Sequence, residues 1–585
     1  MSKLDKINSL IEWATSNNAY ISPKIQFQEI SPNNIGAICT EQLDNSDHDM
    51  IEIPTDLLIT TNTALESFPI ESVNANSVLK LYLARERTSS YITKSKYRQY
   101  LELLPSLIDI GSPLTWSPED KSYLKGTNLG NSLSDILAHL VEEWWQIVNL
   151  IPEDFAKPQD HFINLKFYYE YKYYKDEDLY SFFKDVDVDN WTSFANYVWA
   201  NQILKSRSFP AYLIDKSKFK PDSAMLIPVL DLLNHDSKAE VYWGFKNDKF
   251  CFRNANCVAK QQVFNNYGMK GNEELLLAYG FAIEQNDVDS VALIIKIPQE
   301  LVTQLLETGV KLPTIKDYTT SVVAHNEDDE TTTGDDFKDG VLFFITKDHI
   351  PEALIQTFQF LVQNELDRQQ QASSESKISL RMKLAGLNQL RNALETKRNI
   401  LPQVNKLANN YIKWYIESQQ RIYTTTINKI KQMEKEILQQ EKANLVTLKN
   451  VYKKDVKFQQ SLLIGLGFPS YESILEHGFQ DQCWILWLMR CSNRDEYEES
   501  DDQYIPAWVK SLFDKLKQQI PIDSQEILNY QPIYQQLFPD LSQIVPEIYN
   551  KGEWTVENMI IASRIIDLAG FIRGKDQECI LVKQN

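Results

Sequence analysis

Three segments of this 585-residue chain combine side chains that could carry out chemistry. They are LKSRSFP at 204–210, MLIPVLDLLNHD at 225–236 and NNYGMKGNEELLLAYGF at 265–281. Taken singly, each segment has an ordinary structural explanation. The second segment could be a buried strand, His235 could be a structural histidine, and the final YGF could be three core residues. Any functional interpretation therefore depends on the combination and order of the three segments.

Several common kinds of reaction site are missing from the sequence. There is no GxxxxGK[ST] loop, and the GLG at 465–467 is followed by Phe468 and Pro469, which disfavours a Rossmann cofactor site. Neither a GxSxG nucleophile elbow nor an HExxH motif occurs. The six cysteines are scattered, without zinc-ligand spacing. We therefore expect reduced thiols and no metal site.

Together, and in this order, the three segments resemble the SET-domain methyltransferases. The resemblance is to the branch with a split SET domain and a helical C-terminal domain, which includes the Rubisco large-subunit methyltransferase. The S/R/F segment, DxxNH and Y…NxEL…YGF of that branch occur here as SRSF, DLLNH and YGMKGNEELLLAYGF. YLELLP at 100–105, PLTWSPED at 113–120 and LKGTNLGNSL at 124–133 are also similar.

The resemblance is close over residues 10–300 and looser over the helical remainder. Within the branch, the full-length pattern is most similar to fungal ribosomal-protein lysine methyltransferases, including an ending like ECILVK at 578–583.

The resemblance implies a binding site for S-adenosylmethionine. Asn234 and His235 would contact the cofactor, largely through backbone contacts to adenine and through the Asn side chain. Arg207 would hold the cofactor carboxylate, a task suited to a guanidinium fork. Gly36 matches the family's first glycine-containing turn, where a side chain would obstruct the cofactor. The sequence departs from the family's GxG at Asn34, and asparagine tolerates a left-handed conformation better than most residues.

The resemblance also implies the position of the methyl-transfer site. Tyr267 and Tyr279 correspond to the two tyrosines that frame it, with Tyr279 as the principal orienting group and Tyr267 in support and in contact with the cofactor. Asn272 and Glu274 would brace the turn between the tyrosines. Tyr242 would line the lysine channel, although a core aromatic residue explains this position equally well.

Methyl transfer to lysine requires a neutral amine. An unperturbed lysine, with a pKa of about 10.4, is protonated at neutral pH and cannot attack. An apolar, aromatic channel favours the neutral form by desolvation, and a neighbouring sulfonium acts in the same direction. A phenol oxygen can then orient the amine, and weak CH···O contacts can hold the methyl group. This chemistry requires no metal and no covalent nucleophile.

The distribution of strand-like and helical patterns along the chain predicts a split domain. Strand-like pieces occur between residues 20 and 75 and again between 200 and 300, and helical patterns separate them. We predict an α+β fold: a β-rich SET domain that a helical insertion divides, followed by an all-α C-terminal domain. Its parts are the N-terminal helix and first SET part (1–76), the insertion (77–200), the second SET part with the cofactor and lysine sites (201–300), and the substrate-binding helical domain (301–585).

The charge of the chain indicates its kind of partner. Its 60 basic and 80 acidic residues give a formal net charge of −20, which argues against direct nucleic-acid binding and favours a basic protein partner. The acidic stretches at 325–340 and 494–503 read as loops that could steer such a partner. No apolar run approaches the roughly 18 residues that cross a bilayer, and the N-terminus lacks targeting features. We expect no membrane association and a cytoplasmic protein, with the nucleus as a second location.

The leading hypothesis is an S-adenosylmethionine-dependent protein-lysine N-methyltransferase whose substrate is a ribosomal protein of the large subunit. Cytochrome c is the second choice of substrate, translation elongation factors are the third, and histones remain open. A catalytically inert SET-scaffold binding protein is the alternative from another class, but it would not need the catalytic and cofactor residues together. One member of the branch methylates histidine and lacks the tyrosine of YGF, so Tyr279 favours lysine.

Overall fold

The computed structural model describes residues 2–42, 49–68, 70, 74–174, 179–255, 257–314, 337–373, 377–405, 408–519, 521–573 and 578–583. Of the predicted acidic loop at 325–340, residues 325–336 lie outside the described residues. The chain forms two compact units. The first includes Met1–Ala292 and Arg398–Ile422, and the second includes Leu293–Thr314, Thr331–Lys397 and Tyr423–Asn585.

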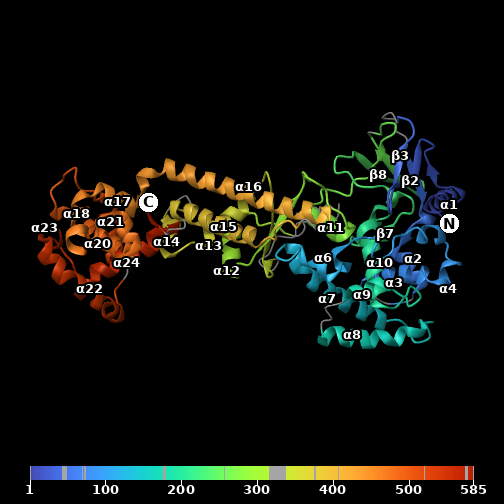
Figure 1. Cartoon of the computed structure of the whole chain (residues 1–585), viewed down its shortest axis with the longest axis horizontal. Helices are drawn as coiled ribbons and strands as arrows, with labels where there is room; N and C mark the ends of the chain where they lie inside the picture. Colours follow the sequence, from blue (N-terminus) through green and yellow to red (C-terminus); the bar gives the residue numbers. More distant parts are fainter. Residues whose placement is uncertain are drawn as a thin grey trace. The chain divides into compact units, whose positions relative to one another are not determined.

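Strands from both sides of the helical insertion pair directly. Antiparallel pairs join β4 (Ile51–Pro54) to β9 (Lys249–Asn254), β3 (Asn34–Cys39) to β10 (Gln262–Val263), and β5 (Ile59–Thr60) to β7 (Ala224–Leu226). The remaining strands of these sheets are β1 (Tyr20–Ile21), β2 (Ile25–Ser31), β6 (Phe209–Pro210) and β8 (Val241–Lys246). Their orders are β1-β4-β9-β8, β10-β3-β2 and β5-β7-β6. The blue and green strands therefore form one domain, and the predicted split is confirmed (Figure 1).

Alternation along the strands explains why they form where they do. In β4, Ile51 and Ile53 are fully buried, while Glu52 faces outward and pairs with Lys249 of β9 at 3.1 Å. Successive side chains of a strand point to opposite faces, so this pattern buries one face and leaves the other to charged groups. The same register sets β9 beside β4 across about 200 residues of sequence.

Helices fill the predicted insertion. They are α2 (Thr61–Ser67), α3 (Ala75–Glu86), α4 (Ser89–Ile92), α5 (Arg98–Leu101), α6 (Pro118–Ser122), α7 (Asn128–Asn149), α8 (Ile163–Tyr174), α9 (Leu179–Lys184) and α10 (Phe194–Arg207), with α1 (Lys3–Ser16) at the N-terminus. Thr127 caps α7, and Leu133, Leu137, Leu140 and Trp144 form its buried stripe. The predicted boundary at 200 falls inside α10, so the helical part runs on to Arg207.

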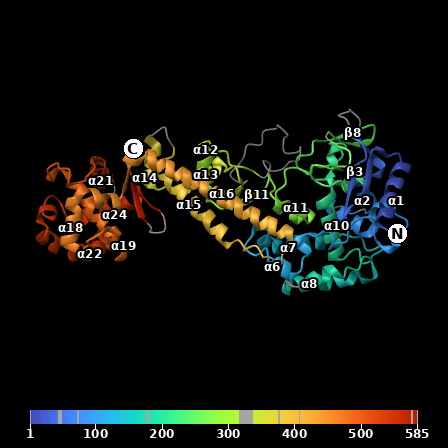
Figure 2. The same cartoon turned by 45° about the horizontal axis from the view of Figure 1, so that its top comes forward.

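The second unit is mostly helical. Its helices are α12 (Gln299–Glu307), α13 (Glu352–Leu361), α14 (Glu365–Ser373), α15 (Leu380–Ile400), α16 (Asn410–Gln440), α17 (Leu448–Lys454), α18 (Val456–Leu466), α19 (Tyr471–Glu476), α20 (Gln480–Ser492), α21 (Ala507–Gln519), α22 (Ser524–Ile544), α23 (Pro546–Tyr549) and α24 (Val556–Ala569). The end of α15 and the start of α16 belong to the first unit. Helices α18, α21, α22 and α24 surround one hydrophobic core (Figure 2). No described helix is long and apolar enough to span a membrane.

This region is predominantly helical, as predicted, but it is not exclusively helical, because it also contains strands. A three-stranded sheet has the order β13 (Leu445–Thr447), β15 (Glu578–Val582), β14 (Gly570–Arg573), and β11 (Ser290–Ile295) pairs with β12 (Val341–Thr346). The ECILVK ending supplies the central strand, in which residues 579–582 are all buried. Such short apolar runs cannot be told from helix segments by periodicity, because only their strand partners define them.

Candidate active site

The DLLNH and NNY segments lie side by side. His235 forms a parallel bridge with Asn265. The Asn265 N–H donates to the carbonyl of Asn234 at 2.8 Å, and the Asp236 N–H donates to the carbonyl of Asn265 at 3.0 Å. The Tyr267 N–H donates to Nδ1 of His235 at 3.0 Å. The structure thus brings together Asn234, His235 and Tyr267, three of the predicted site residues.

A column of aromatic rings continues from this pair of segments. The ring of Tyr267 stacks on His235, with centroids 4.9 Å apart, and on Tyr279, with centroids 4.8 Å apart. Phe281 contacts Tyr279 edge-on. The Tyr267 hydroxyl donates to the carbonyl of Leu233 at 2.8 Å, whereas no described residue hydrogen-bonds the Tyr279 hydroxyl. Tyr267 is therefore held in place, and the Tyr279 hydroxyl is left for a ligand.

Both phenols are neutral at physiological pH. Burial raises the pKa of Tyr267 to about 12, and it also raises the pKa of Tyr279 well above the ordinary value. A neutral phenol can donate or accept a hydrogen bond. The two tyrosines can therefore orient a substrate amine, but they are not phenolate bases.

Helix α11 (Asn272–Tyr279) carries Tyr279 at its last position. At its first turn, the buried Asn272 donates its backbone N–H to Asp289 Oδ1 at 2.8 Å. The Asn272 side chain donates to the carbonyl of Ile283 at 3.0 Å and accepts from the Ile283 N–H at 2.9 Å. Asn272 therefore ties the start of α11 to the chain that follows the helix, and its predicted bracing role is confirmed.

Glu274, the other predicted brace, is exposed and contacts this turn through an ion pair with Lys270. Its neighbour Glu273 points inward instead and accepts a hydrogen bond from the Tyr415 hydroxyl of α16 at 2.7 Å. Burial raises the pKa of Glu273. In the sequence the two glutamates look alike, and only the contact with Tyr415 of α16 decides that Glu273 is the half-buried one.

A glycine lets the insertion reach the end of α11. Gly280 caps the helix with φ of 77°, and a Cβ at this position would lie 1.9 Å from the carbonyl oxygen of Ile110. Ser112, from the same loop, donates its hydroxyl to the carbonyl of Leu277 at 2.7 Å. The loop that ends at PLTWSPED therefore holds the turn of α11 that carries Tyr279.

Gly36 lies beside the Asn234 side chain. A Cβ at Gly36 would come within 2.7 Å of Gln262 Oε1 and 3.0 Å of Asn234 Nδ2, and these two atoms are themselves hydrogen-bonded at 2.6 Å. This close approach leaves little room for a side chain at Gly36, and the predicted obstruction of the cofactor stays a prediction. The left-handed residue of the neighbouring hairpin is Asn33, with φ of 63°, while Asn34 is in β3. The left-handed conformation considered for Asn34 is therefore wrong, and its departure from GxG causes no backbone strain.

Arg207 lies in a polar cluster that the motif analysis did not anticipate. Its Nη1 donates to the carbonyl of Asp231 at 3.0 Å and lies 3.4 Å from Asp231 Oδ2. The Tyr100 hydroxyl donates to the same Oδ2 at 2.6 Å. Tyr100 comes from the insertion, and Asp231 is the first residue of DLLNH. The side chain of Arg207 is 22% exposed, and these contacts use one of its nitrogen atoms, so the fork retains donors for a ligand.

Two buried polar atoms of the site have no partner among the described residues. They are Nε2 of His235 and Oδ1 of Asp231. Because Nδ1 of His235 accepts a hydrogen bond, the neutral ring carries its proton on Nε2, and burial lowers the pKa of His235 and favours that neutral form. An unsatisfied buried polar atom costs about 1 to 3 kcal/mol. A donor and an acceptor left unpaired fit a polar ligand with groups of both kinds.

The backbone just before DLLNH is strained. Val229 is fully buried and has φ of 75° and ψ of −51°, a conformation that a β-branched residue rarely adopts. Such strain costs about 1 to 3 kcal/mol and persists only where the surroundings enforce it. Here the enforced turn directs the following segment toward Asn265 and Tyr267.

Tyr242 is not brought into the aromatic column. It is 52% exposed on β8, its ring lies against Gly244, and the guanidinium of Arg253 stacks 4.4 Å from the ring centroid. Its role in a lysine channel stays a prediction.

One group of potential metal ligands occurs within the described part of the chain. Asp49, Glu52 and Cys251 bring ligand atoms within 4.8 Å of one another. Arg253 pairs with Asp49 at 3.2 Å, and Lys249 pairs with Glu52 at 3.1 Å. The two carboxylates thus already have cationic partners.

Comparisons with known proteins agree with this geometry. Residues 290–441 match the model of the EFM1 middle domain. Over 554 residues, 88% of this chain and 90% of the relative, the chain is 30% identical to Ribosomal lysine N-methyltransferase 1 of Saccharomyces cerevisiae. It is 28% identical, over 99% and 98% of the two chains, to Protein-lysine N-methyltransferase EFM1 of the same yeast. A structure of Rubisco LSMT bound to AdoMet superposes with a TM-score of 0.52 at 15% identity, over 81% of this chain and 99% of that chain.

The fold and the site therefore define a SET-domain protein. The chain belongs to the family of SET-domain protein-lysine N-methyltransferases, and the resemblance drawn from its motifs is confirmed.

Proposed function

We propose that this enzyme methylates the side-chain amine of a lysine in a ribosomal protein of the large subunit, with S-adenosylmethionine as the methyl donor. The observation that carries the proposal is the stack of His235, Tyr267 and Tyr279, which has an unsatisfied Nε2 on His235 and, on Tyr279, a hydroxyl that no described residue hydrogen-bonds. The name of the 30% identical yeast relative supports the choice of substrate. The acidic net charge of −20 suits a basic protein.

The cofactor site is proposed from the residues around Gly36. Asn234 and His235 would bind the adenine end, and Arg207 would bind the carboxylate through its remaining donors. The unpaired Oδ1 of Asp231 is an acceptor suited to an ammonium group. When bound, S-adenosylmethionine supplies a methyl group activated by its sulfonium. The protein supplies position, and no metal is needed for this chemistry.

The tyrosines act on the substrate amine. Aromatic walls desolvate the incoming lysine and lower the pKa of its ammonium group, so the amine loses its proton before attack. The Tyr279 hydroxyl accepts or donates one hydrogen bond to that amine and sets its direction. Tyr267, anchored on the carbonyl of Leu233, keeps the Tyr279 ring from tilting.

This mechanism predicts how the rate depends on pH. We expect kcat/KM to rise between about pH 7 and 9, because the fraction of neutral substrate amine rises with pH. Neither active-site phenol titrates in that range, since burial raises the pKa of both. Rates measured on an identified protein substrate, in buffers where the enzyme stays folded, check this. A rate that falls over this range would contradict the neutral-phenol mechanism.

A second prediction concerns cofactor binding. Asn234→Ala should raise the Kd for S-adenosylmethionine about tenfold, the usual effect of losing one good polar contact. The melting temperature of the free protein should change little, because the side chain bonds only to the half-buried Gln262. Calorimetric titration measures both. Asn149→Ala, which removes an exposed amide at the end of α7, is the control. Unchanged affinity would make DLLNH a structural segment only.

The proposed substrate is tested with lysate from cells that lack the enzyme. Incubation with radiolabelled S-adenosylmethionine should label a small basic ribosomal protein, which mass spectrometry of the band identifies. Replacement of the modified lysine by arginine in that protein should abolish labelling. Labelling of cytochrome c or of an elongation factor would mean that the proposed substrate is wrong and the proposed activity is right. If no protein is labelled, the inert-scaffold alternative gains.

We propose that the enzyme acts in the cytosol, with the nucleus as a second location. The six cysteines, all free and buried, support a reducing compartment.

A further inference from the structure

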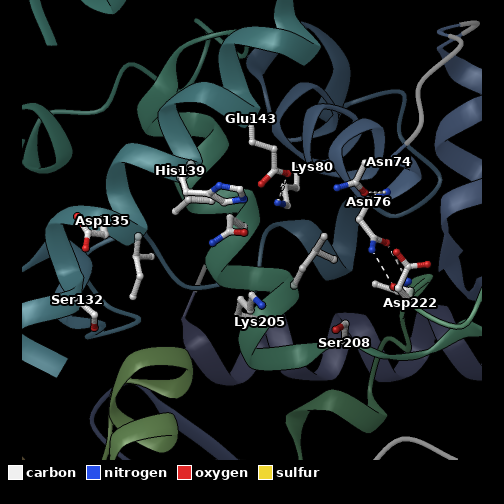
Figure 3. Close-up of a pocket in the computed structure, with 15 residues that line it drawn as sticks. Asn74, Asn76, Lys80, Ser132, Asp135, His139, Glu143, Lys205, Ser208 and Asp222 are labelled. Carbon is white, nitrogen blue, oxygen red and sulfur yellow. Dashed lines mark hydrogen bonds and ion pairs between the residues drawn. The ribbon is translucent and has the colours of Figure 1, made fainter. Parts of the chain in front are cut away.

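A cavity of about 690 Å³ lies in the first unit between α3, α7 and α10 (Figure 3). From α10 and its C-cap residue Ser208, the lining includes Asn201, Leu204, Lys205 and Ser208. These positions are three or four residues apart and share one side of the helix. Each residue of an α-helix is rotated by about 100° about the helix axis from the one before it. Arg207 therefore projects about 120° away from that side of α10, toward Asp231. The cavity is therefore distinct from the candidate active site, although both use the end of α10.

A buried ion pair forms one wall of the cavity. Lys80 is 7% exposed, and its Nζ lies 2.6 Å from Oε1 of Glu143. The same oxygen accepts hydrogen bonds from the hydroxyls of Ser77 at 2.7 Å and Tyr197 at 2.6 Å. Oε1 of Glu143 thus accepts hydrogen bonds from three donors. The Lys80 ammonium has three N–H donors and uses one of them on Glu143. The pair leaves donors free on the side of the cavity.

A second ammonium faces the same space. Lys205 is exposed at the mouth of the cavity and forms no ion pair with any described residue. Burial lowers the pKa of Lys80, the Glu143 carboxylate raises it, and the charge of Lys205 lowers it further. Lys80 therefore has a carboxylate partner in Glu143, whereas Lys205 has none among the described residues. An anion between them would offset their repulsion.

The cavity also contains an unpaired amide. Asn201 is only 4% exposed, and none of the described residues hydrogen-bonds its side chain. Its amide atoms are not among the fully enclosed unpaired atoms, so they are accessible from the cavity. Asn201 lines the cavity, so a polar occupant could satisfy it.

We propose that this cavity binds a small anionic molecule, whose phosphate or carboxylate group lies between Lys80 and Lys205 and accepts a hydrogen bond from Asn201. Two acids at the periphery, Asp135 and Asp222, repel an extended polyanion and so favour a small molecule over nucleic acid. The volume is in the range of metabolite-binding pockets. The neighbouring His139 can hydrogen-bond to the rest of such a ligand (Figure 3).

The test is a titration of the full-length protein with inorganic phosphate and, separately, with citrate, at constant ionic strength. We expect a saturable signal by calorimetry and a saturable rise in melting temperature with at least one of them. The arm that responds distinguishes phosphate from carboxylate recognition. Phosphate stabilises many proteins without a site, but that effect does not saturate and does not depend on one lysine.

Lys205→Ala is the decisive variant, because an exposed, unpaired side chain can be removed without unfolding the protein. The substitution should raise the Kd for the anion about tenfold or more, because one charge-assisted hydrogen bond is lost. Asn201→Leu, which keeps the side-chain volume, should weaken binding as well. Lys216→Ala, at an exposed lysine outside the cavity, should bind like the wild type. No saturable binding of either anion, or equal affinity in the wild type and Lys205→Ala, would overturn the proposal. This readout needs no methyl transfer, so it is independent of the proposed substrate.

Discussion

We expect Tyr279→Phe to lower kcat about 100-fold, while the affinity for S-adenosylmethionine changes little. The substitution keeps the ring that stacks on Tyr267 and removes only a hydroxyl that no described residue engages. Loss of a positioned polar group of this kind costs about 2.7 kcal/mol of transition-state stabilisation. Because nothing in the folded protein loses a partner, stability should be nearly unchanged. Single-turnover rates and cofactor titration measure the two effects separately.

Two further variants make this result interpretable. Tyr169→Phe removes an exposed hydroxyl on α8 and should match the wild type. Tyr267→Phe breaks the hydrogen bond to the Leu233 carbonyl and should lower both rate and stability. The number of methyl groups added should also be measured, since in the proposed site the Tyr279 hydroxyl would occupy space near the amine. If Tyr279→Phe equals the wild type in rate and product distribution, the orienting role is wrong.

The second large effect is expected for Gly280→Ala, which should destabilise the first unit by about 2 to 4 kcal/mol and remove most activity. The residue has φ of 77°, and the new Cβ would overlap the carbonyl oxygen of Ile110 at 1.9 Å. Relief of that overlap requires the loop before Ser112 to move away from α11. Tyr279, the adjacent residue, would lose its position at the same time.

Gly309→Ala is a matched control for this prediction. Gly309 also has a left-handed φ, of 83°, but no atom lies within 4 Å of a Cβ built there. Its substitution carries only the backbone penalty, about 1 to 2 kcal/mol. Gly309 lies in the second unit, so denaturant unfolding compares the loss in each unit's own transition, and the excess loss in Gly280→Ala gives the cost of the contact with the insertion. Equal losses of stability in the two variants would show that the Ile110 contact does not matter.

Local patterns in the sequence were sufficient for the plan of the domain. Alternating and helical periodicities marked β-rich parts on both sides of a helical insertion, because burial of one face leaves a repeat that short windows reveal. The order of SRSF, DLLNH and YGF is likewise visible in the sequence, and the family resemblance that it carries implies Asn234, His235 and Tyr267 as site residues. Gly36 followed from its place in the motif.

Only the tertiary structure decided which neighbours complete the site. Glu273, and not Glu274, is half-buried because Tyr415 of α16 lies on that side of α11. Tyr100 reaches Asp231 across 131 residues of sequence, and Ile110 meets Gly280 across the insertion. The C-terminal sheet exists because the chain end finds two strand partners. Each of these outcomes depends on contacts between distant segments, and a local sequence pattern carries information only about the face that an element buries.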